Sequence, residues 1–203
     1  MKKFFAIAAM ALVTLVANAQ TPDQGTFSIT PKAGISYGGY FHTSYSAGQE
    51  IETQGSIGFT VGAEASYMAG TWFKPSIGVE YTSVANTFKY ETGGDYTLTS
   101  GYLAIPVLAN FYVSNGWALK VGVQPAFLLS ASGSNDKDQK EFLNSTDFSI
   151  PIGTSYEFGN FMLDITFHLG ITNTVKDGCT MSHHDKLSNG YGTFTIGYRL
   201  DLK

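Results

Sequence analysis

The chain has 203 residues, of which 43% are hydrophobic, 14% aromatic and only 14% charged, with a formal net charge of −4. Soluble domains usually carry about 25% charged residues, so this chain is poor in charge. Its single cysteine excludes an internal disulfide framework, and 12 basic against 16 acidic residues offer no basic surface for nucleic acid. After the first twenty residues no apolar run approaches the ~20 residues of a membrane-spanning helix. A glycine-rich, aromatic-rich β protein remains.

The beginning of the chain has the pattern of a secretory signal peptide. Two lysines form a positive start, residues 4–16 are apolar, and Ala17-Asn18-Ala19 offers a small-residue cleavage site. The apolar stretch is shorter than a transmembrane helix, which disfavours an uncleaved anchor. We therefore predict that residues 1–19 are removed on export and that residues 20–203 form one domain, with a charge of 10 − 16 = −6.

Eight segments then alternate apolar and polar residues, which is the period of β-strands with two unlike faces. The segments are residues 27–37, 56–67, 73–82, 103–111, 119–130, 148–158, 161–172 and 193–202. The seventh is the clearest, because its apolar set from Phe161 to Ile171 never breaks phase. The fourth is apolar on both faces near its middle, so its parity stays open. In the fifth, Leu129 is predicted on the apolar face and Ser130 on the polar face.

Short and long connections alternate between these segments. Short turns are predicted at residues 69–71, 114–116 and 159–160, and longer polar stretches at residues 38–54, 86–95, 132–144 and 173–190. An even number of up-and-down strands, with short turns at one end and long loops at the other, is typical of bacterial outer-membrane barrels. The sequence therefore predicts an all-β, eight-stranded antiparallel transmembrane barrel.

The composition of the polar face decides which face points outward. A soluble lipocalin-like barrel also alternates, but it carries its apolar face inside and charged residues outside. Here the polar face is mostly Gly, Ser and Thr, as expected for the narrow lumen of an eight-stranded barrel. Its few charges nearly balance and are expected to pair, because an unpaired buried charge is costly. They are Lys32, Lys74, Lys120 and Arg199 against Glu64, Glu80, Glu157, Asp164 and Asp201.

Aromatic residues gather at the predicted short turns. Trp72 and Trp117 lie beside two of these turns, and Phe158 and Phe161 flank the third. Membrane proteins place such side chains at the interface between lipid and water. The alternative is ordinary core packing, since aromatic rings fill soluble β cores equally well.

The fourth and fifth segments resemble a known family. Tyr102-Leu103-Ala104-Ile105-Pro106-Val107-Leu108 is similar to the Y-L-x-I-P-hydrophobic signature of PorT-type outer-membrane barrels, and residues 124–131 resemble the stretch that follows it. Residues 163–173 and 197–200 resemble the last two strands of that family. The resemblance implies a small outer-membrane barrel, with links to protein secretion in some members. It implies no reaction and no cofactor.

This chain departs from the family pattern in two places. Ala104 and Asn110 stand where the family commonly carries Glu and Lys, so a lumen ion pair built there is absent or relocated. The chain also ends Leu200-Asp201-Leu202-Lys203 instead of on the terminal aromatic residue that the barrel-assembly machinery favours as an insertion signal.

Two clusters in the predicted loops could carry chemistry. The soft-donor cluster, which could hold a transition metal, comprises Cys179, Met181, His183, His184 and Asp185. Its spacing fixes no ligand geometry, so a solvated loop is the expectation. The residues that could assemble a nucleophilic triad are His42, Ser44 and Asp95. These residue types are common in loops, so we expect no enzyme, no metal and no cofactor.

Function is therefore expected from the loops, which carry specificity on rigid scaffolds. The leading hypothesis is a structural or surface-interaction barrel, or one that assists an envelope or secretion assembly. Its partners would be outer-membrane lipid, the barrel-assembly machinery during insertion, and an unknown molecule bound through residues 38–54 and 173–190. The alternatives are a narrow pore or hydrophobic-ligand conduit, and an enzyme at the rim.

Overall fold

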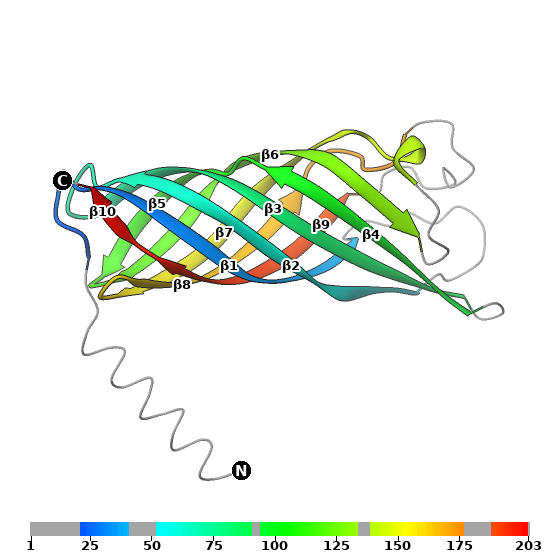
Figure 1. The fold of residues 1–203 in the computed structure, drawn as a ribbon, viewed down its shortest axis with the longest axis horizontal. Helices are drawn as coiled ribbons and strands as arrows, with labels where there is room; N and C mark the ends of the chain where they lie inside the picture. The colour runs from blue at the N-terminus through cyan, green and yellow to red at the C-terminus, as the bar shows by residue number, and fades with distance from the viewer. Residues whose placement is uncertain (1–20, 41–51, 91–93, 134–138, 177–187, 203) are drawn as a thin grey trace, which may run out of the picture.

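The computed structural model describes residues 21–40, 52–90, 94–133, 139–176 and 188–202. Their strands form a single antiparallel sheet that closes on itself, because β1 pairs with β2 on one side and with β9 and β10 on the other. Figure 1 shows the resulting barrel with its strands strongly tilted. The predicted signal peptide, residues 1–19, lies outside the described residues. No helix in the described part of the chain is long and apolar enough to cross a membrane.

The barrel wall has eight strand positions around its circumference, as predicted from the sequence. Each strand position, whether it holds one strand or two consecutive ones, is called a stave. The strands are β1 (Phe27–Tyr40), β2 (Glu52–Tyr67), β3 (Phe73–Tyr90), β4 (Gly94–Ala104), β5 (Val107–Ser114), β6 (Trp117–Gly133), β7 (Thr146–Phe158), β8 (Phe161–Gly170), β9 (Asn189–Tyr198) and β10 (Leu200–Leu202). β4 and β5 are two parts of one stave, since both pair with β3 and β6. They separate at Pro106, which has no N–H to donate to a ladder. β9 and β10 likewise share a stave beside β1.

The two ends of the barrel differ, as the alternation of short and long connections predicted. At the turn rim, residues 68–72, 115–116 and 159–160 join neighbouring strands, and Gly116 and Gly159 adopt positive φ there. At the loop rim, β1, β3, β6 and β8 end, and the short helix η1 (Lys140–Phe142) follows β6. The predicted loop at residues 86–95 is wrong: β3 runs to Tyr90 and β4 begins at Gly94, because Thr87 and Thr97 continue the ladder with a hydroxyl contact of 2.9 Å.

Side chains alternate between a buried lumen and an exposed outer wall. Along β8, Asp164, Thr166 and His168 are buried, whereas Ile165, Phe167 and Leu169 between and beyond them are exposed. The apolar face therefore points outward, which excludes a soluble barrel with an apolar interior. Aromatic side chains gather at the turn rim as predicted, with the exposed Trp72 stacked on Phe111 at 5.9 Å and the exposed Phe161 stacked on Phe158 at 5.7 Å.

At two places the alternation did not correctly predict which side chains point into the lumen and which point outward. On the fourth stave, Tyr102, Ala104 and Leu108 point into the lumen, which settles the parity that the sequence left open. On β6, the prediction that Ser130 faces the lumen is wrong. Tyr102 pairs with Leu128 but Gly101 pairs with Ser130, so Leu129 is an extra residue and both it and Ser130 lie outside.

Candidate functional site: the barrel lumen

A central charge cluster crosses the lumen. The Lys120 ammonium contacts the carboxylates of Asp164 and Glu64, the latter at 3.5 Å. Lys32 lies 3.2 Å from Glu64 and 2.7 Å from Glu80. The five side chains come from β1, β2, β3, β6 and β8 and are all buried. Through Lys120 the cluster ties β6 to β2 and to β8, neither of which pairs with β6 in the sheet.

Glycines on the facing wall make room for these long side chains. A Cβ on Gly34 would lie 1.9 Å from the Phe194 carbonyl oxygen, and one on Gly62 would lie 2.4 Å from the Val79 carbonyl oxygen. Side chains at these positions would therefore collide with the backbone of the neighbouring strand. Small residues on the lumen face thus permit both the close approach of strands and the space that the lysines fill.

A second charge cluster lies near the turn rim and centres on Glu157. This carboxylate is 1% exposed and contacts both the Lys74 ammonium and the Arg199 guanidinium. The Tyr112 hydroxyl donates a hydrogen bond to Glu157 Oε1 at 2.5 Å. Arg199 Nε also donates to Asp201, at 2.9 Å, where the wall opens at the rim. Together the two clusters contain all nine lumen charges predicted from the sequence, and each charge has an opposite partner.

The two residues that depart from the PorT-type pattern, Asn110 and Ala104, lie in different places in the lumen. The neutral Asn110 side chain donates to the Lys74 carbonyl oxygen at 2.7 Å and to Ser76 Oγ at 3.0 Å. It therefore binds β5 to β3 by hydrogen bonds and not by an ion pair. Ala104 is fully buried in an apolar cluster. The lumen ion pairs between described residues form from other strands.

Toward the loop rim the lumen changes character. The His168 ring stacks on Tyr191, with centroids 4.3 Å apart, and Gln124 Nε2 donates to the Tyr191 hydroxyl at 2.7 Å. Asn189 donates to the Tyr102 hydroxyl at 3.0 Å and to Asp147 at 3.3 Å. Sequence reasoning placed Asn189 in a loop and missed this layer. The signal was present, because residues 189 and 191 continue the alternation of the eighth segment.

An apolar cluster also lies in this half of the lumen. Its members are Val84, Leu98, Tyr102, Ala104, Ala126, Leu128, Ala131, Leu143 and Tyr191. Leu143 follows η1 and forms a bridge with Val175, and the Asn144 N–H donates to the Thr174 carbonyl oxygen at 2.9 Å. The segments after β6 and after β8 therefore meet over the apolar cluster and cover it.

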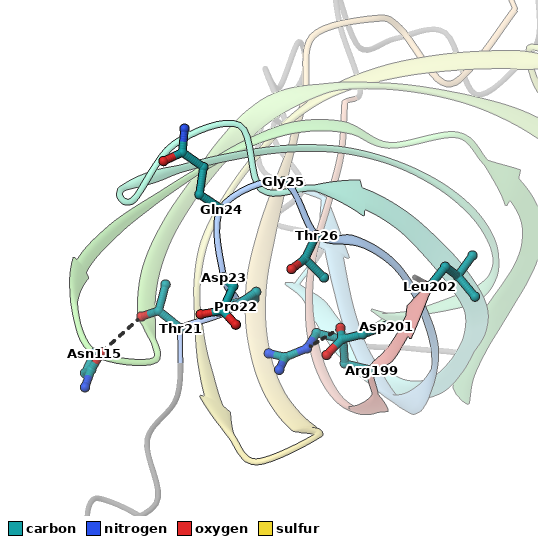
Figure 2. A pocket seen from close by; sticks show the side chains of 10 residues that line it. All are labelled: Thr21, Pro22, Asp23, Gln24, Gly25, Thr26, Asn115, Arg199, Asp201 and Leu202. Carbon is teal, nitrogen blue, oxygen red and sulfur yellow. Dashed lines mark hydrogen bonds and ion pairs between the residues drawn. The ribbon is translucent and has the colours of Figure 1, made fainter.

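The N-terminal segment crosses the opposite mouth. Figure 2 shows residues 21–26 passing over the opening, with Arg199 and Asp201 on one side of the segment. A recess of about 720 Å³ lies between the segment and the end of β9 and β10, and Asp23 and Thr26 also line it. A second recess, of about 430 Å³, lies on the other side of the same segment, next to Tyr112.

Neither chemical candidate from the sequence is assembled by the described residues. The cluster from Cys179 to Asp185 lies outside them, as do His42 and Ser44. Asp95 lies in β4 opposite Lys89, in a strand and not in the predicted loop. Among the residues that the structure describes, no group of His, Cys, Asp and Glu side chains could hold a metal ion.

Comparison with known proteins identifies the family. The sequence profile of the outer membrane protein beta-barrel domain matches residues 18–176. The chain belongs to this family. It is therefore a small barrel of the bacterial outer membrane, in which short turns face the periplasm and long loops face outward. The search of the curated proteins found no match.

Solved outer-membrane barrels of this architecture are similar at low identity. Ail, the attachment invasion locus protein of Yersinia pestis, in complex with the heparin analogue sucrose octasulfate, is 14% identical with a TM-score of 0.48, covering 88% of this chain and 100% of its own. Neisserial surface protein A is 17% identical with a TM-score of 0.47, covering 87% and 97%. Outer Membrane Protein W of E. coli is 18% identical with a TM-score of 0.40, covering 89% and 100%.

Proposed function

We propose that this outer-membrane barrel is a closed scaffold that presents its loop rim to a partner outside the cell or within an envelope assembly. The observation that carries the proposal is the pairing of the charged side chains inside the lumen. Lys120, Glu64 and their neighbours cross the periplasmic half of the lumen, and Glu157 with its partners lies nearer the turn rim. A lumen filled in this way is built for rigidity and leaves recognition to the loops.

At the loop rim some strands extend beyond the others, which would hold the loops away from the lipid surface. β3 is 18 residues long and β8 only 10, so part of the sheet extends beyond the rest, as the hairpin of β3 and β4 does in Figure 1. A transmembrane β-strand needs about 9–11 residues, so the excess length lies outside the lipid. The Lys176 N–H donates to the Phe142 carbonyl oxygen at 3.0 Å, which joins the segments after β6 and β8 at the same rim.

Photo-crosslinking in intact cells tests the proposal. A photoreactive side chain at Gln54 or Lys176, both exposed at the loop rim, should capture a discrete partner. The matched control is Ile165, which is exposed on the lipid-facing wall and should capture only lipid. Capture of the same species from all three positions, or no species from the two rim positions of a folded barrel, would contradict the proposal.

We also propose that the chain belongs to the PorT-type branch of the family. The signature from Tyr102 to Leu108 supports a PorT-type member that assists protein secretion. Deletion of the chain from cells should then lower the amount of secreted protein, and the unsubstituted chain should restore it. A full secreted fraction in the deletion strain would contradict the secretion role and leave the display role standing.

We propose that insertion requires outer-membrane lipid and the barrel-assembly machinery. The closing stave ends on Leu200 and Leu202, whose side chains are exposed to lipid, and not on an aromatic residue. Replacing Leu202 with Phe should therefore speed assembly, measured as the rate at which the folded, heat-modifiable band accumulates. An unchanged rate would show that an aromatic side chain at position 202 does not speed assembly of this barrel.

A hydrophobic-ligand conduit is the second candidate, and the apolar cluster favours it. Leu128 and Leu143 lie in the outward half of the lumen, where a bound apolar molecule could replace their contacts. Binding of a fluorescent fatty acid that is lost in Leu143→Asp but retained in Phe142→Asp, whose side chain is exposed, would support it. The catalytic alternative has no support from described residues, and we expect no enzyme activity.

A further inference from the structure

The N-terminal segment holds the periplasmic mouth through specific backbone contacts. The Gly25 N–H donates to the Met68 carbonyl oxygen at 2.7 Å, and the Met68 N–H donates to the Thr26 carbonyl oxygen at 2.9 Å. Thr26 N–H also donates to the Asp23 carbonyl oxygen at 3.1 Å, so the segment turns on itself before β1 begins. Gly25 has a φ of +88°, a conformation that residues with a Cβ rarely adopt.

The far end of the segment is fixed to a different turn. The Gly116 N–H donates to Thr21 Oγ1 at 3.0 Å, and the Thr21 hydroxyl lies 3.4 Å from Asn115 Oδ1. Residues 115–116 join β5 to β6, and β2 and β3 separate β5 from β1 around the wall. The segment therefore spans the mouth from the start of β1 to the turn between β5 and β6 (Figure 2).

Two side chains at the segment are shielded from solvent. Pro22 is buried, and Met68 has no exposed surface. The recess of about 720 Å³ next to Arg199 and that of about 430 Å³ next to Tyr112 are separated by the same four residues, Thr21–Gln24. Release of these residues would join the two recesses above the Glu157 cluster.

We infer that residues 21–26 form a latch that opens and closes access from the periplasm to the Glu157 cluster. Its closed form rests on a few hydrogen bonds, and Asp23, Gln24 and Gly25 are exposed. Segments with few buried contacts and exposed hydrogen bonds open at far lower free energy than the strands beside them. The latch therefore opens while the barrel stays folded. This inference concerns the periplasmic end and does not depend on the proposed loop partner.

Hydrogen exchange of the Gly116 amide measures the opening directly. Gly25→Ala should speed this exchange about tenfold, since a Cβ disfavours the left-handed conformation. Gly70→Ala is the matched control, because it lies at the same rim with open space around it and should leave the rate unchanged. Thr21→Ala should also speed exchange, and Thr21→Ser, which keeps the accepting oxygen, should restore the slow rate.

Exchange at the ladder amide of Val121 distinguishes latch opening from loss of the fold. Faster exchange at Gly116 with an unchanged rate at Val121 supports the latch. No change at Gly116 in Gly25→Ala and Thr21→Ala, or equal acceleration at both amides, would overturn it.

Chemical access gives an independent readout. In a Cys179→Ser background, Met68→Cys keeps the backbone bonds of the latch, so a water-soluble maleimide should react slowly. Adding Gly25→Ala should raise the labelling rate about tenfold, and adding Gly70→Ala should not. Equal labelling rates in the three proteins would contradict the inference, and if Met68→Cys fails to fold, the exchange measurement on the otherwise unsubstituted chain decides.

Discussion

The two halves of the lumen are filled by different chemistry within one barrel. In the periplasmic half, charged side chains such as Lys120 and Glu157 each contact opposite charges. In the outward half, Leu128 and its neighbours pack together, and Tyr191 and His168 stack. An unpaired charge in a desolvated space is costly, whereas apolar side chains need only complementary shape. The periplasmic half therefore fixes which staves face one another, and the outward half can tolerate exchange of similar side chains.

Removing one member of the central charge cluster should have the largest effect. Lys120→Met leaves Glu64 and Asp164 without their shared cation, so the free energy of unfolding should fall by about 4 kcal/mol. Urea unfolding in lipid vesicles measures it. Lys176→Met, at an exposed position of the loop rim, is the control and should change stability by less than about 0.5 kcal/mol.

A neutral version of the cluster sharpens the same comparison. Lys120→Met alone leaves Lys32 as the one cation among three carboxylates of the cluster. Adding Glu64→Gln and Asp164→Asn removes the excess negative charge, so most of the stability lost by Lys120→Met should return. A triple variant as unstable as the single variant would show that packing, and not charge pairing, holds this half of the lumen.

In the outward half, truncation should cost less than breaking the ion pairs. Leu128→Ala leaves a cavity in the apolar cluster, and the expected loss is about 3 kcal/mol. The adjacent Leu129 points outward, where lipid closes around an alanine, so Leu129→Ala should cost only about 1 kcal/mol. Equal losses for these neighbours would mean that the two faces of β6 are wrongly assigned.

A single hydroxyl in the periplasmic cluster should have the smallest of these effects. Tyr112→Phe removes the donor to Glu157, which keeps its two cations, so the loss should be about 1.5 kcal/mol. Tyr67→Phe, at an exposed position of the outer wall, should change stability by less than about 0.5 kcal/mol. A loss below that value for Tyr112→Phe would exclude the hydroxyl from the cluster.

Much of the barrel could be predicted from the sequence, because a period of two is a local property of each strand. The eight staves, the three short turns and the nine lumen charges all follow from which residues share parity with Lys32, Glu64 or Asp164. The side on which each charge lies was therefore accessible, but its partner was not. Whether Lys120 meets Asp164 or Glu157 depends on strand tilt and stagger around the closed wall, which no single segment encodes.

The predictions from sequence were wrong where an extra residue interrupts the alternation of a strand, or where a strand has the polar composition of a loop. Ser130 was placed in the lumen, yet one extra residue at Leu129 reverses the alternation. Residues 86–95 have loop-like composition, but threonines on neighbouring strands pair across the sheet. Residues 21–26 carry no periodic signal at all, since their positions depend on contacts with Met68 and Gly116, which lie far along the chain.

The central claim is that paired side chains close the lumen, and single-channel recording in planar bilayers tests it most directly. The purified barrel should show no ion conductance above the baseline of the bilayer at high salt. The variant Lys120→Ala with Glu64→Ala and Asp164→Ala, if it folds, should conduct, because it empties the middle of the lumen. Steady conductance by the unsubstituted chain would contradict the closed lumen and favour a pore.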